Sequence, residues 1–210
     1  MKSSFAMKKK GEIVGITATI FVAFAILLTS VFKITTPKYA YSQTELSGKQ
    51  EIGKPVQVDY QLAYPGKIHP DSMLWYVKVV RDKLWYTFTF DKGKKTELNL
   101  LFADKRLSCA LELFKKHKPD LGLSTLTKAE KYLEKAVPTN ADDSEYLKKV
   151  ALASLMHREV IENQILPLSP EDIAPKVNKI NDYSKETYKK ARDLMYSKGL
   201  VPPENVFESK

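Results

Sequence analysis

The sequence predicts an all-α protein: one N-terminal transmembrane helix, then an extracytoplasmic bundle of four or five amphipathic helices with an extended arm. Two observations carry this prediction, an uncharged apolar run at residues 13–32 and helical periodicity with start and stop signals over most of residues 71–199. Residues 56–64 alternate with a period of two, but no second strand of comparable quality exists. We therefore expect an extended arm that lies on helices.

The composition limits the class of protein. The 210 residues make about one domain, and 43% hydrophobic with 28% charged residues excludes wholesale disorder. A single cysteine excludes an intramolecular disulfide framework and a cysteine-based zinc site. The organisation that follows is a cytoplasmic tail (1–12), a membrane span (13–32), a linker and arm (33–63), a helical domain (64–199) and a tail (200–210).

The apolar run at residues 13–32 has the length of a membrane span. At about 1.5 Å per residue it extends roughly 30 Å, which matches the hydrocarbon core of a bilayer. A cleavable signal peptide has a shorter apolar region, and the best cut, after Ala40, places Lys38 where a small residue is required. An uncleaved anchor is therefore favoured, with secretion after cleavage as the alternative.

The flanking charges predict the orientation of that span. Four lysines precede it, whereas Lys33 and Lys38 follow it closely, so the N-terminus is expected in the cytoplasm and the helical domain outside. Of the formal net charge of +9, +3 lies up to Glu12 and +6 is spread over the remainder. Without a basic stripe or a recognition motif, we expect no nucleic-acid partner.

The first two outer helices are expected at residues 71–90 and 91–117. Asp71 and Asp91 are candidate N-caps, and Pro119 ends the second helix. Because the joint is short, the two should form an antiparallel hairpin in which Trp85 is buried and Lys83 and Lys95 are exposed. The facing apolar residues would be Leu74, Val77, Leu84 and Phe88 on the first helix and Leu98, Leu101, Leu107, Leu111 and Phe114 on the second.

Three further helices are expected towards the C-terminus. They cover residues 120–136, residues 144–164, and a last segment from Ser169 to a C-cap near Gly199. Ser169, followed by a proline and an aspartate, is typical of a capping-box start, and Pro175 should bend or restart the helix.

Several short motifs lie within residues 64–136: Tyr64-Pro65-Gly66, Pro70-Asp71-Ser72, Trp75-Tyr76-x-Lys78, Phe88-Thr89-Phe90-Asp91 and Arg106-Leu107. Together they resemble a bacterial helical family catalogued as a domain of unknown function, number 5667. The resemblance implies an extracytoplasmic domain behind a signal or anchor segment, and it supplies no catalytic residues. The chain departs from the pattern at residues 67–69, where the family usually has an apolar stretch. The residues expected to hold the fold are Asp71, Trp75, Trp85, Phe88, Asp91, Leu98, Arg106 and Leu107.

The three histidines and the cysteine favour structural roles. His157 has Ile161 four residues later, so the zinc-protease pair is missing. His69 precedes the cap Asp71 without a recognisable nucleophile, and His117 complements a helix C-terminus. Cys109 is expected to be a small buried residue. We expect no catalytic residue, cofactor or metal ion.

An aromatic and basic cluster in the first helix has two interpretations. It contains Trp75, Tyr76, Trp85, Tyr86, Phe88 and Phe90 with Lys78, Arg81 and Lys83. Such helices can lie on anionic membranes, but aromatic residues at helical spacing more often form a core, which is the favoured interpretation.

The function expected from the sequence is a membrane-anchored outer domain that binds, spaces or supports, and does not catalyse. Its partners would be the lipid bilayer and another envelope or membrane protein. One alternative is an envelope sensor that signals through a membrane partner, favoured by a pocket lined by aromatics of the first helix. The other is a cell-wall hydrolase that uses acids such as Glu112, Asp142 or Glu159, which would have to converge about 5–10 Å apart.

Overall fold

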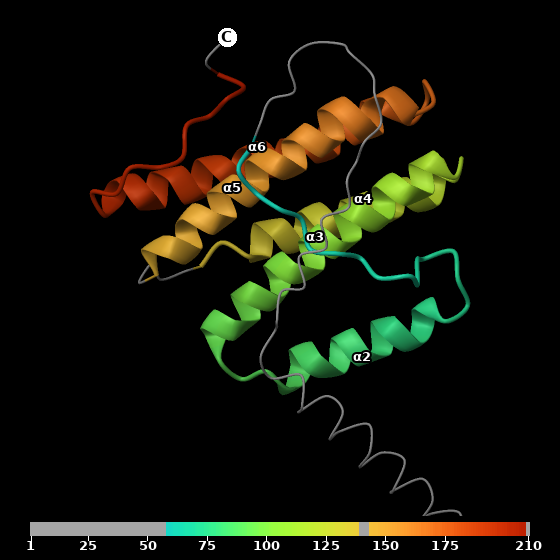
Figure 1. The fold of residues 1–210 in the computed structure, drawn as a ribbon, viewed down its shortest axis with the longest axis horizontal. Helices are drawn as coiled ribbons and strands as arrows, with labels where there is room; N and C mark the ends of the chain where they lie inside the picture. Colours follow the sequence, from blue (N-terminus) through green and yellow to red (C-terminus); the bar gives the residue numbers. More distant parts are fainter. Residues whose placement is uncertain (1–57, 139–142, 209–210) are drawn as a thin grey trace, which may run out of the picture. The chain divides into compact units, whose positions relative to one another are not determined.

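The computed structural model describes residues 58–138 and 143–208 of the chain. These residues form five α-helices and no β-strand, as predicted (Figure 1). None of the described helices is both long and apolar enough to cross a membrane. The predicted span at 13–32, its orientation and the linker up to residue 57 lie outside the described residues.

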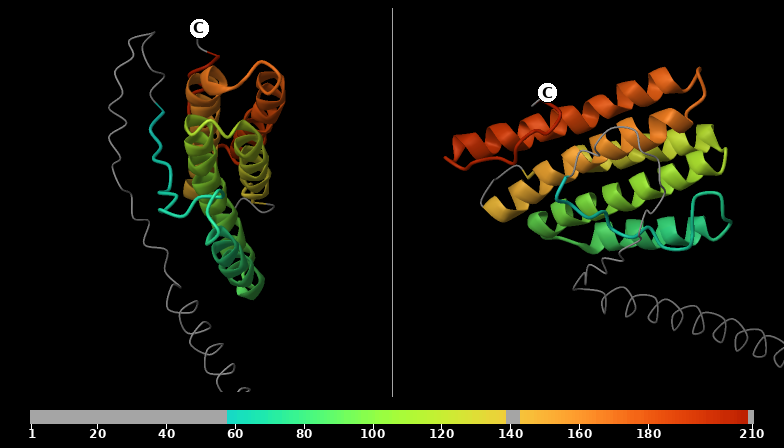
Figure 2. Two further views of the ribbon diagram at one scale, coloured as in Figure 1. Left: turned by 90° about the vertical axis from the view of Figure 1, so that its right-hand side faces the viewer. Right: turned by 45° about the horizontal axis from the view of Figure 1, so that its top comes forward.

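Four of the helices form a bundle of two antiparallel pairs (Figure 2). α3 (Lys92–Lys115) pairs with α4 (Pro119–Lys135), and α5 (Ser144–Val160) pairs with α6 (Ala174–Ser197). A π-helical turn (Ile161–Ile165) and a short 3-10 helix (Leu166–Leu168) continue α5. The predicted limits of these elements are within a few residues of those observed.

The core of the bundle is apolar and receives side chains from all four helices. One cluster joins Leu107 and Phe114 of α3 to Leu126 of α4, Ile161 after α5 and Val177 of α6. A second cluster joins α3, α4, α5 and α6 through residues that include Leu100, Leu133, Val150 and Tyr188. Leu98 and Leu107 are buried as predicted, and Cys109 is fully buried with a free thiol.

Helix ends follow the capping chemistry at some positions and not at others. The Asp91 carboxylate accepts from the backbone N–H of Lys94 at 2.7 Å, which confirms this cap. Ser169 is not a cap, because its hydroxyl donates to the carbonyl of Ile165, and α6 begins only at Ala174. Pro175 therefore lies in the first turn of α6, where it interrupts no hydrogen bond and causes no bend.

Residues 58–74, called the arm here, have neither helix nor strand and lie against the bundle. Val58 and Ala63 are buried, and Leu62 packs on the cluster around Leu107. For residues 58–63, the described part of the predicted arm, the structure shows neither helix nor strand and side chains that pack on the bundle.

α2 (Trp75–Phe88) runs antiparallel to α3, as predicted. At one end Asp71 pairs with Lys118 at 2.9 Å, just beyond the end of α3. At the other end Trp85 contacts Phe102 of α3 edge to face, with ring centroids 6.2 Å apart. The cap prediction for Asp71 is wrong, because α2 starts four residues later at Trp75 and Asp71 is held by lysines instead.

The predicted packing of α2 on α3 is wrong for most of the chosen apolar residues. Leu74, Val77 and Phe88 are exposed and Leu84 is half-buried. Trp85 contacts α3 instead, and Asp82 is the buried residue of α2. Trp85 is half-buried, Lys83 is exposed as predicted, and Lys95 is half-buried because its ammonium lies 5.4 Å from the centre of the Tyr86 ring.

Candidate functional site

A cavity of about 580 Å³, called the arm cavity here, lies between the arm and the bundle in the described part of the chain. Arm residues form one wall, and α3, α5 and the π-helical turn form the other. The lining is mainly apolar, and it includes the aromatic rings of Tyr60 and Tyr64 from the arm. The other apolar lining residues are Leu62, Ala63, Pro65, Leu111, Met156 and Val160.

A few polar groups line the same cavity. Ser108, Glu112, Lys115 and Gln164 contribute from the helices, and His69 contributes from the arm. Glu112 and Lys115 form an ion pair at 3.2 Å. His69 Nε2 lies 3.1 Å from the carbonyl of Gly66, whereas its buried Nδ1 atom has no hydrogen-bond partner among the described residues. His69 thus has one hydrogen-bonding contact within the arm and one buried ring nitrogen without a partner among the described residues.

A buried ionic cluster connects the arm to the centre of the bundle. His157 Nδ1 lies 2.7 Å from Glu130 of α4, and its Nε2 lies 3.2 Å from Asp104 of α3. The second oxygen of Asp104 accepts a hydrogen bond from the Tyr60 hydroxyl at 2.8 Å. The second oxygen of Glu130 accepts from the Ser184 hydroxyl of α6 at 2.7 Å. The cluster thus joins the four bundle helices to the arm through polar contacts.

The two carboxylates keep His157 charged. Burial alone would lower the pKa of His157, but the negative charge of Glu130 and the hydrogen bonds to Asp104 and Glu130 raise that pKa to about 9. At neutral pH the imidazolium is therefore the state that this site stabilises. A buried cation between two carboxylates is a structural ion cluster. Removing any one of its members would leave a buried charge without a partner, which is strongly destabilising.

The cluster lacks the arrangement that a histidine base needs. Both ring nitrogens of His157 contact carboxylates, and the Ser184 hydroxyl donates to Glu130 and not to the imidazole. A general base must reach the proton that it removes, and here no ring nitrogen is directed at a nucleophile. Among residues 58–138 and 143–208, no group of three or more His, Cys, Asp or Glu residues is placed to hold a metal ion.

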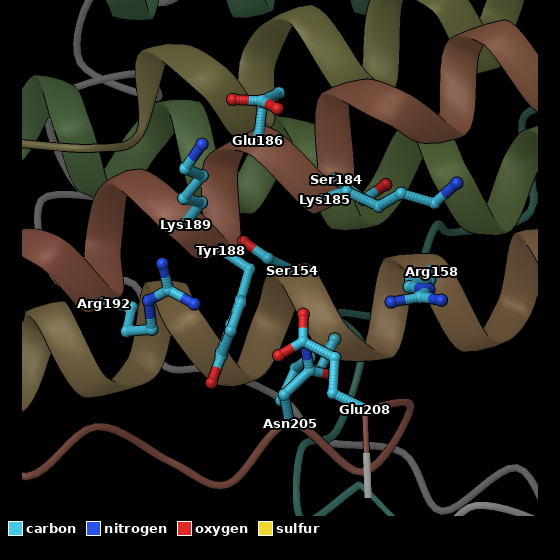
Figure 3. A pocket seen from close by; sticks show the side chains of 11 residues that line it. Ser154, Arg158, Ser184, Lys185, Glu186, Tyr188, Lys189, Arg192, Asn205 and Glu208 are labelled. Atoms are coloured by element: carbon cyan, nitrogen blue, oxygen red, sulfur yellow. The ribbon is translucent and has the colours of Figure 1, made fainter. Parts of the chain in front are cut away.

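A second, smaller cavity of about 200 Å³ lies between α5, α6 and the C-terminal segment (Figure 3). Figure 3 shows Arg158 and Arg192 at its two ends, with Tyr188 between them. Both arginines have partners within the chain: Arg158 pairs with Glu162 and lies 4.2 Å from the centre of the Phe207 ring, and Arg192 pairs with Asp193. Each guanidinium group therefore has an acidic partner within the chain.

The third surface feature is the outer stripe of α2, which we define as Leu74, Val77, Val80, Leu84 and Phe88. Four of the five are exposed, and Leu84 is half-buried. The spacing of three and four residues puts all of them on one face of the helix, and that face points away from α3.

The aromatic cluster predicted in α2 is divided between two environments. Tyr76 and Phe90 are 75% and 84% exposed, whereas Trp75, Trp85 and Tyr86 are half-buried. The interpretation as core is therefore wrong for about half of the cluster. Arg106, also expected to hold the fold, is buried with its guanidinium 4.5 Å from the centre of the Tyr132 ring.

The structure does not show the three acids considered for hydrolysis, Glu112, Asp142 and Glu159, converging on one site. Asp142 lies outside the described residues, and Glu112 is paired with Lys115. Glu159 accepts hydrogen bonds from Asn163 and Gln164, and burial is the main cause that raises the pKa of its carboxyl group. The acids that do converge are Asp104 and Glu130, on either side of His157.

The sequence contained a signal for this ionic cluster. Asp104, Glu130 and His157 each stand where the helical period of their own helix requires an apolar residue; Glu130, for example, lies four residues after Leu126 and three before Leu133. A charged residue at such a core position needs a buried partner. Three such residues on three helices are therefore expected to be partners of one another.

Comparison with known proteins identifies a family. A family model described as Domain of unknown function (DUF5667) matches residues 67–171, which confirms the resemblance and extends it beyond residue 136. The matched range contains Asp104, Glu130 and His157 but not the arm residues before Lys67 or α6. No curated protein and no solved structure matches the chain.

Proposed function

We propose, for a chain that belongs to the DUF5667 family, the role of a membrane-anchored outer domain that binds a small amphipathic molecule in the arm cavity without catalysing a reaction. The observation that carries this proposal is the arm cavity itself. Its volume of about 580 Å³ falls in the range of roughly 300–1,000 Å³ that is typical of ligand sites.

The lining of the arm cavity supports a ligand with an apolar body and few polar groups. Leu111, Met156 and Val160 offer apolar contact, and Ser108 and Gln164 offer hydrogen bonds. The buried His69 Nδ1 atom supplies one further polar contact, because a buried group without a partner loses free energy that a ligand can restore.

The anchor and the outward orientation belong to the same proposal. They are supported by the uncharged run at residues 13–32 and by the four lysines before it. In this arrangement the bound molecule comes from outside the cytoplasm, and the partners are the bilayer and another envelope or membrane protein.

A sensor is a second candidate, and the connection of the arm to the ionic cluster favours it. Tyr60 lines the arm cavity and also donates to Asp104, which contacts His157. A ligand that displaces Tyr60 would remove a hydrogen bond from a buried carboxylate. Since the arm directly follows the linker to the proposed span, such a change has a route to the membrane segment.

The test is to identify what co-purifies with the detergent-solubilised full chain and to block the cavity. Ser108→Trp places a large ring in the cavity, and Ser197→Trp is a matched control on α6. Both serine hydroxyls donate to a carbonyl of the preceding helical turn, but Ser197 is exposed and lies outside the cavity lining.

We expect mass spectrometry to find a small molecule with the native chain and with Ser197→Trp, and to find it lost with Ser108→Trp. The melting temperature of Ser108→Trp should remain close to that of the apo protein. A molecule that is retained in Ser108→Trp would contradict binding in the arm cavity. A chain that stays in the aqueous phase on detergent phase separation would contradict the anchor alone.

A further inference from the structure

The outer stripe of α2 is an apolar surface without an intramolecular partner among the described residues. Leu74, Val77 and Val80 are 57%, 68% and 57% exposed. Single exposed apolar side chains are ordinary, but a contiguous row of them marks a surface for another molecule or a membrane. Tyr76 and Phe90 are also exposed, at 75% and 84%.

The other face of α2 is occupied, so the helix cannot simply turn its stripe inward. Trp85 packs on Phe102, and the buried Asp82 is paired with Arg81 at 2.7 Å. The Lys78 ammonium donates to the carbonyls of Pro65 and Ile68 in the arm. Rotating α2 would break these contacts and bring Val77 inward only by exposing both tryptophans.

The polar side chains that border the stripe are mainly basic. Arg81 is exposed on the same face as the stripe, seven residues from both Leu74 and Phe88. Lys83 is exposed on α2, and Lys92 and Lys94 are exposed just after it. The acids in the same stretch are engaged: Asp82 is buried against Arg81, and Asp91 caps α3. An apolar face with aromatic residues and a basic border is complementary to an anionic lipid surface.

The chain outside the described residues has the right length to bring α2 to such a surface. This step rests on the anchor of the proposed function at residues 13–32. Only 25 residues, 33–57, separate that run from the arm. A flexible chain of this length spans about 25–30 Å on average, so a tethered domain stays within reach of the bilayer.

We propose that α2 lies on the surface of the anchoring bilayer, with the outer stripe in the interface and its basic residues against anionic lipid headgroups. The helix is then a second membrane contact, and it fixes the orientation of the arm cavity relative to the bilayer. Two weak contacts in one chain act together, because the anchor raises the effective concentration of the lipid surface around α2.

The experiment uses the full chain reconstituted in vesicles of phosphatidylcholine and phosphatidylglycerol with brominated acyl chains. The sole cysteine, Cys109, is fully buried and is replaced by alanine. Val77→Cys then carries an environment-sensitive fluorophore on the stripe, and Val201→Cys is the matched control. Both positions are exposed valines, but Val201 lies in the C-terminal segment after α6.

We expect quenching by brominated lipid and a blue shift at Val77→Cys, with neither at Val201→Cys. Both effects should weaken when phosphatidylglycerol is omitted and should be lost when Val80→Asp is added. Flotation of the vesicles tests the anchor separately. Full flotation without quenching at position 77 would overturn the surface contact but not the anchor. If the same position is labelled with pyrene, excimer emission instead of quenching would assign the stripe to contact with a second copy of the chain.

Discussion

α2 and the bundle α3–α6 are built from similar amphipathic helices but turn opposite faces inward. In α3 the residues spaced at three and four, such as Leu107, Leu111 and Phe114, are buried against α4, α5 and α6. In α2 the equivalent row, the outer stripe, faces away from α3. The helical period of a sequence therefore locates an apolar face but does not determine which surface covers it.

The number of neighbours explains the difference. α3 has helices on several sides, so its apolar row is covered from more than one direction. Among the described residues, α2 contacts α3 through Trp85 and the arm through Lys78. A helix at the end of a hairpin can therefore leave its apolar row for another surface.

The largest expected effect is the difference in stability loss between two leucine-to-alanine substitutions, one in the bundle and one in the outer stripe. Leu107→Ala should lower the free energy of unfolding by about 2–5 kcal/mol, because Leu107 is fully buried. Leu74→Ala should change it by no more than about 0.5 kcal/mol, because more than half of Leu74 is exposed. Chemical denaturation of the full chain in detergent measures both, and equal losses would contradict the opposite orientation of the two rows.

The second prediction concerns pH and the ionic cluster within the bundle. The pKa of His157 is raised from 6.5 to about 9 in the folded protein, so the folded state keeps a proton that the unfolded state loses above pH 6.5. The stabilisation is fully present below pH 6.5 and is lost as the pH rises through about 9, with a total of about 3 kcal/mol. Denaturation midpoints between pH 6 and 10 measure this loss.

His157→Gln is the control for that pH dependence. The variant should be less stable at pH 6.5 because Asp104 and Glu130 lose the cation between them. Its stability should also be nearly independent of pH over the same interval. A native protein whose stability stays level from pH 6.5 to 10 would show that His157 is neutral when folded.

Much of the fold could be predicted from the sequence, because helical periodicity and the Asp91 cap both depend on residues that are only a few positions apart in the chain. The limits of α3 and α4, the start of α5 and the antiparallel course of α2 follow from such local signals, whereas α6 begins later than the predicted start at Ser169. The outward direction of the stripe could not be predicted, because it depends on which side chains of α3 meet α2. Nor could the Asp71 pairing, which joins residues 47 positions apart in the sequence.

The candidate site was less accessible to prediction than the fold. The arm cavity requires the arm, α3 and α5 to lie side by side, which no local pattern encodes. The ionic cluster did leave a trace, since Asp104, Glu130 and His157 occupy core positions of three helices. Which of these residues contact each other depends on how the three helices pack, and the sequence pattern of each helix does not contain that information.

A third prediction concerns Trp85, the main contact between α2 and the bundle. Trp85→Ala removes a half-buried ring that packs on Phe102, so we expect a loss of about 2 kcal/mol. The loss should be local: hydrogen exchange should accelerate in residues 75–88 while α4 and α6 stay protected. Cooperative loss of protection in all helices would mean that α2 and the bundle are one folding unit.

The smallest effects are expected at two helix ends with the same geometry. His117 after α3 and Gly199 after α6 both have left-handed backbone, with φ of 55° and 70°. His117→Gly should stabilise the protein by about 0.5–1 kcal/mol, and Gly199→Ala should destabilise it by about 1 kcal/mol. Thermal unfolding measures both, and a loss of stability in His117→Gly would show that the imidazole makes a stabilising contact.

The outward direction of the apolar row of α2 can be measured by thiol labelling of the native full chain in detergent and without lipid, so that no bilayer covers the stripe. Val80→Cys introduces a thiol on the outer stripe, and Cys109 is a buried internal reference in the same molecule. With N-ethylmaleimide, we expect the introduced thiol to react at a rate close to that in the denatured chain, while Cys109 reacts only after unfolding. Protection of both thiols to the same degree would contradict the account, because it would place the stripe in a core.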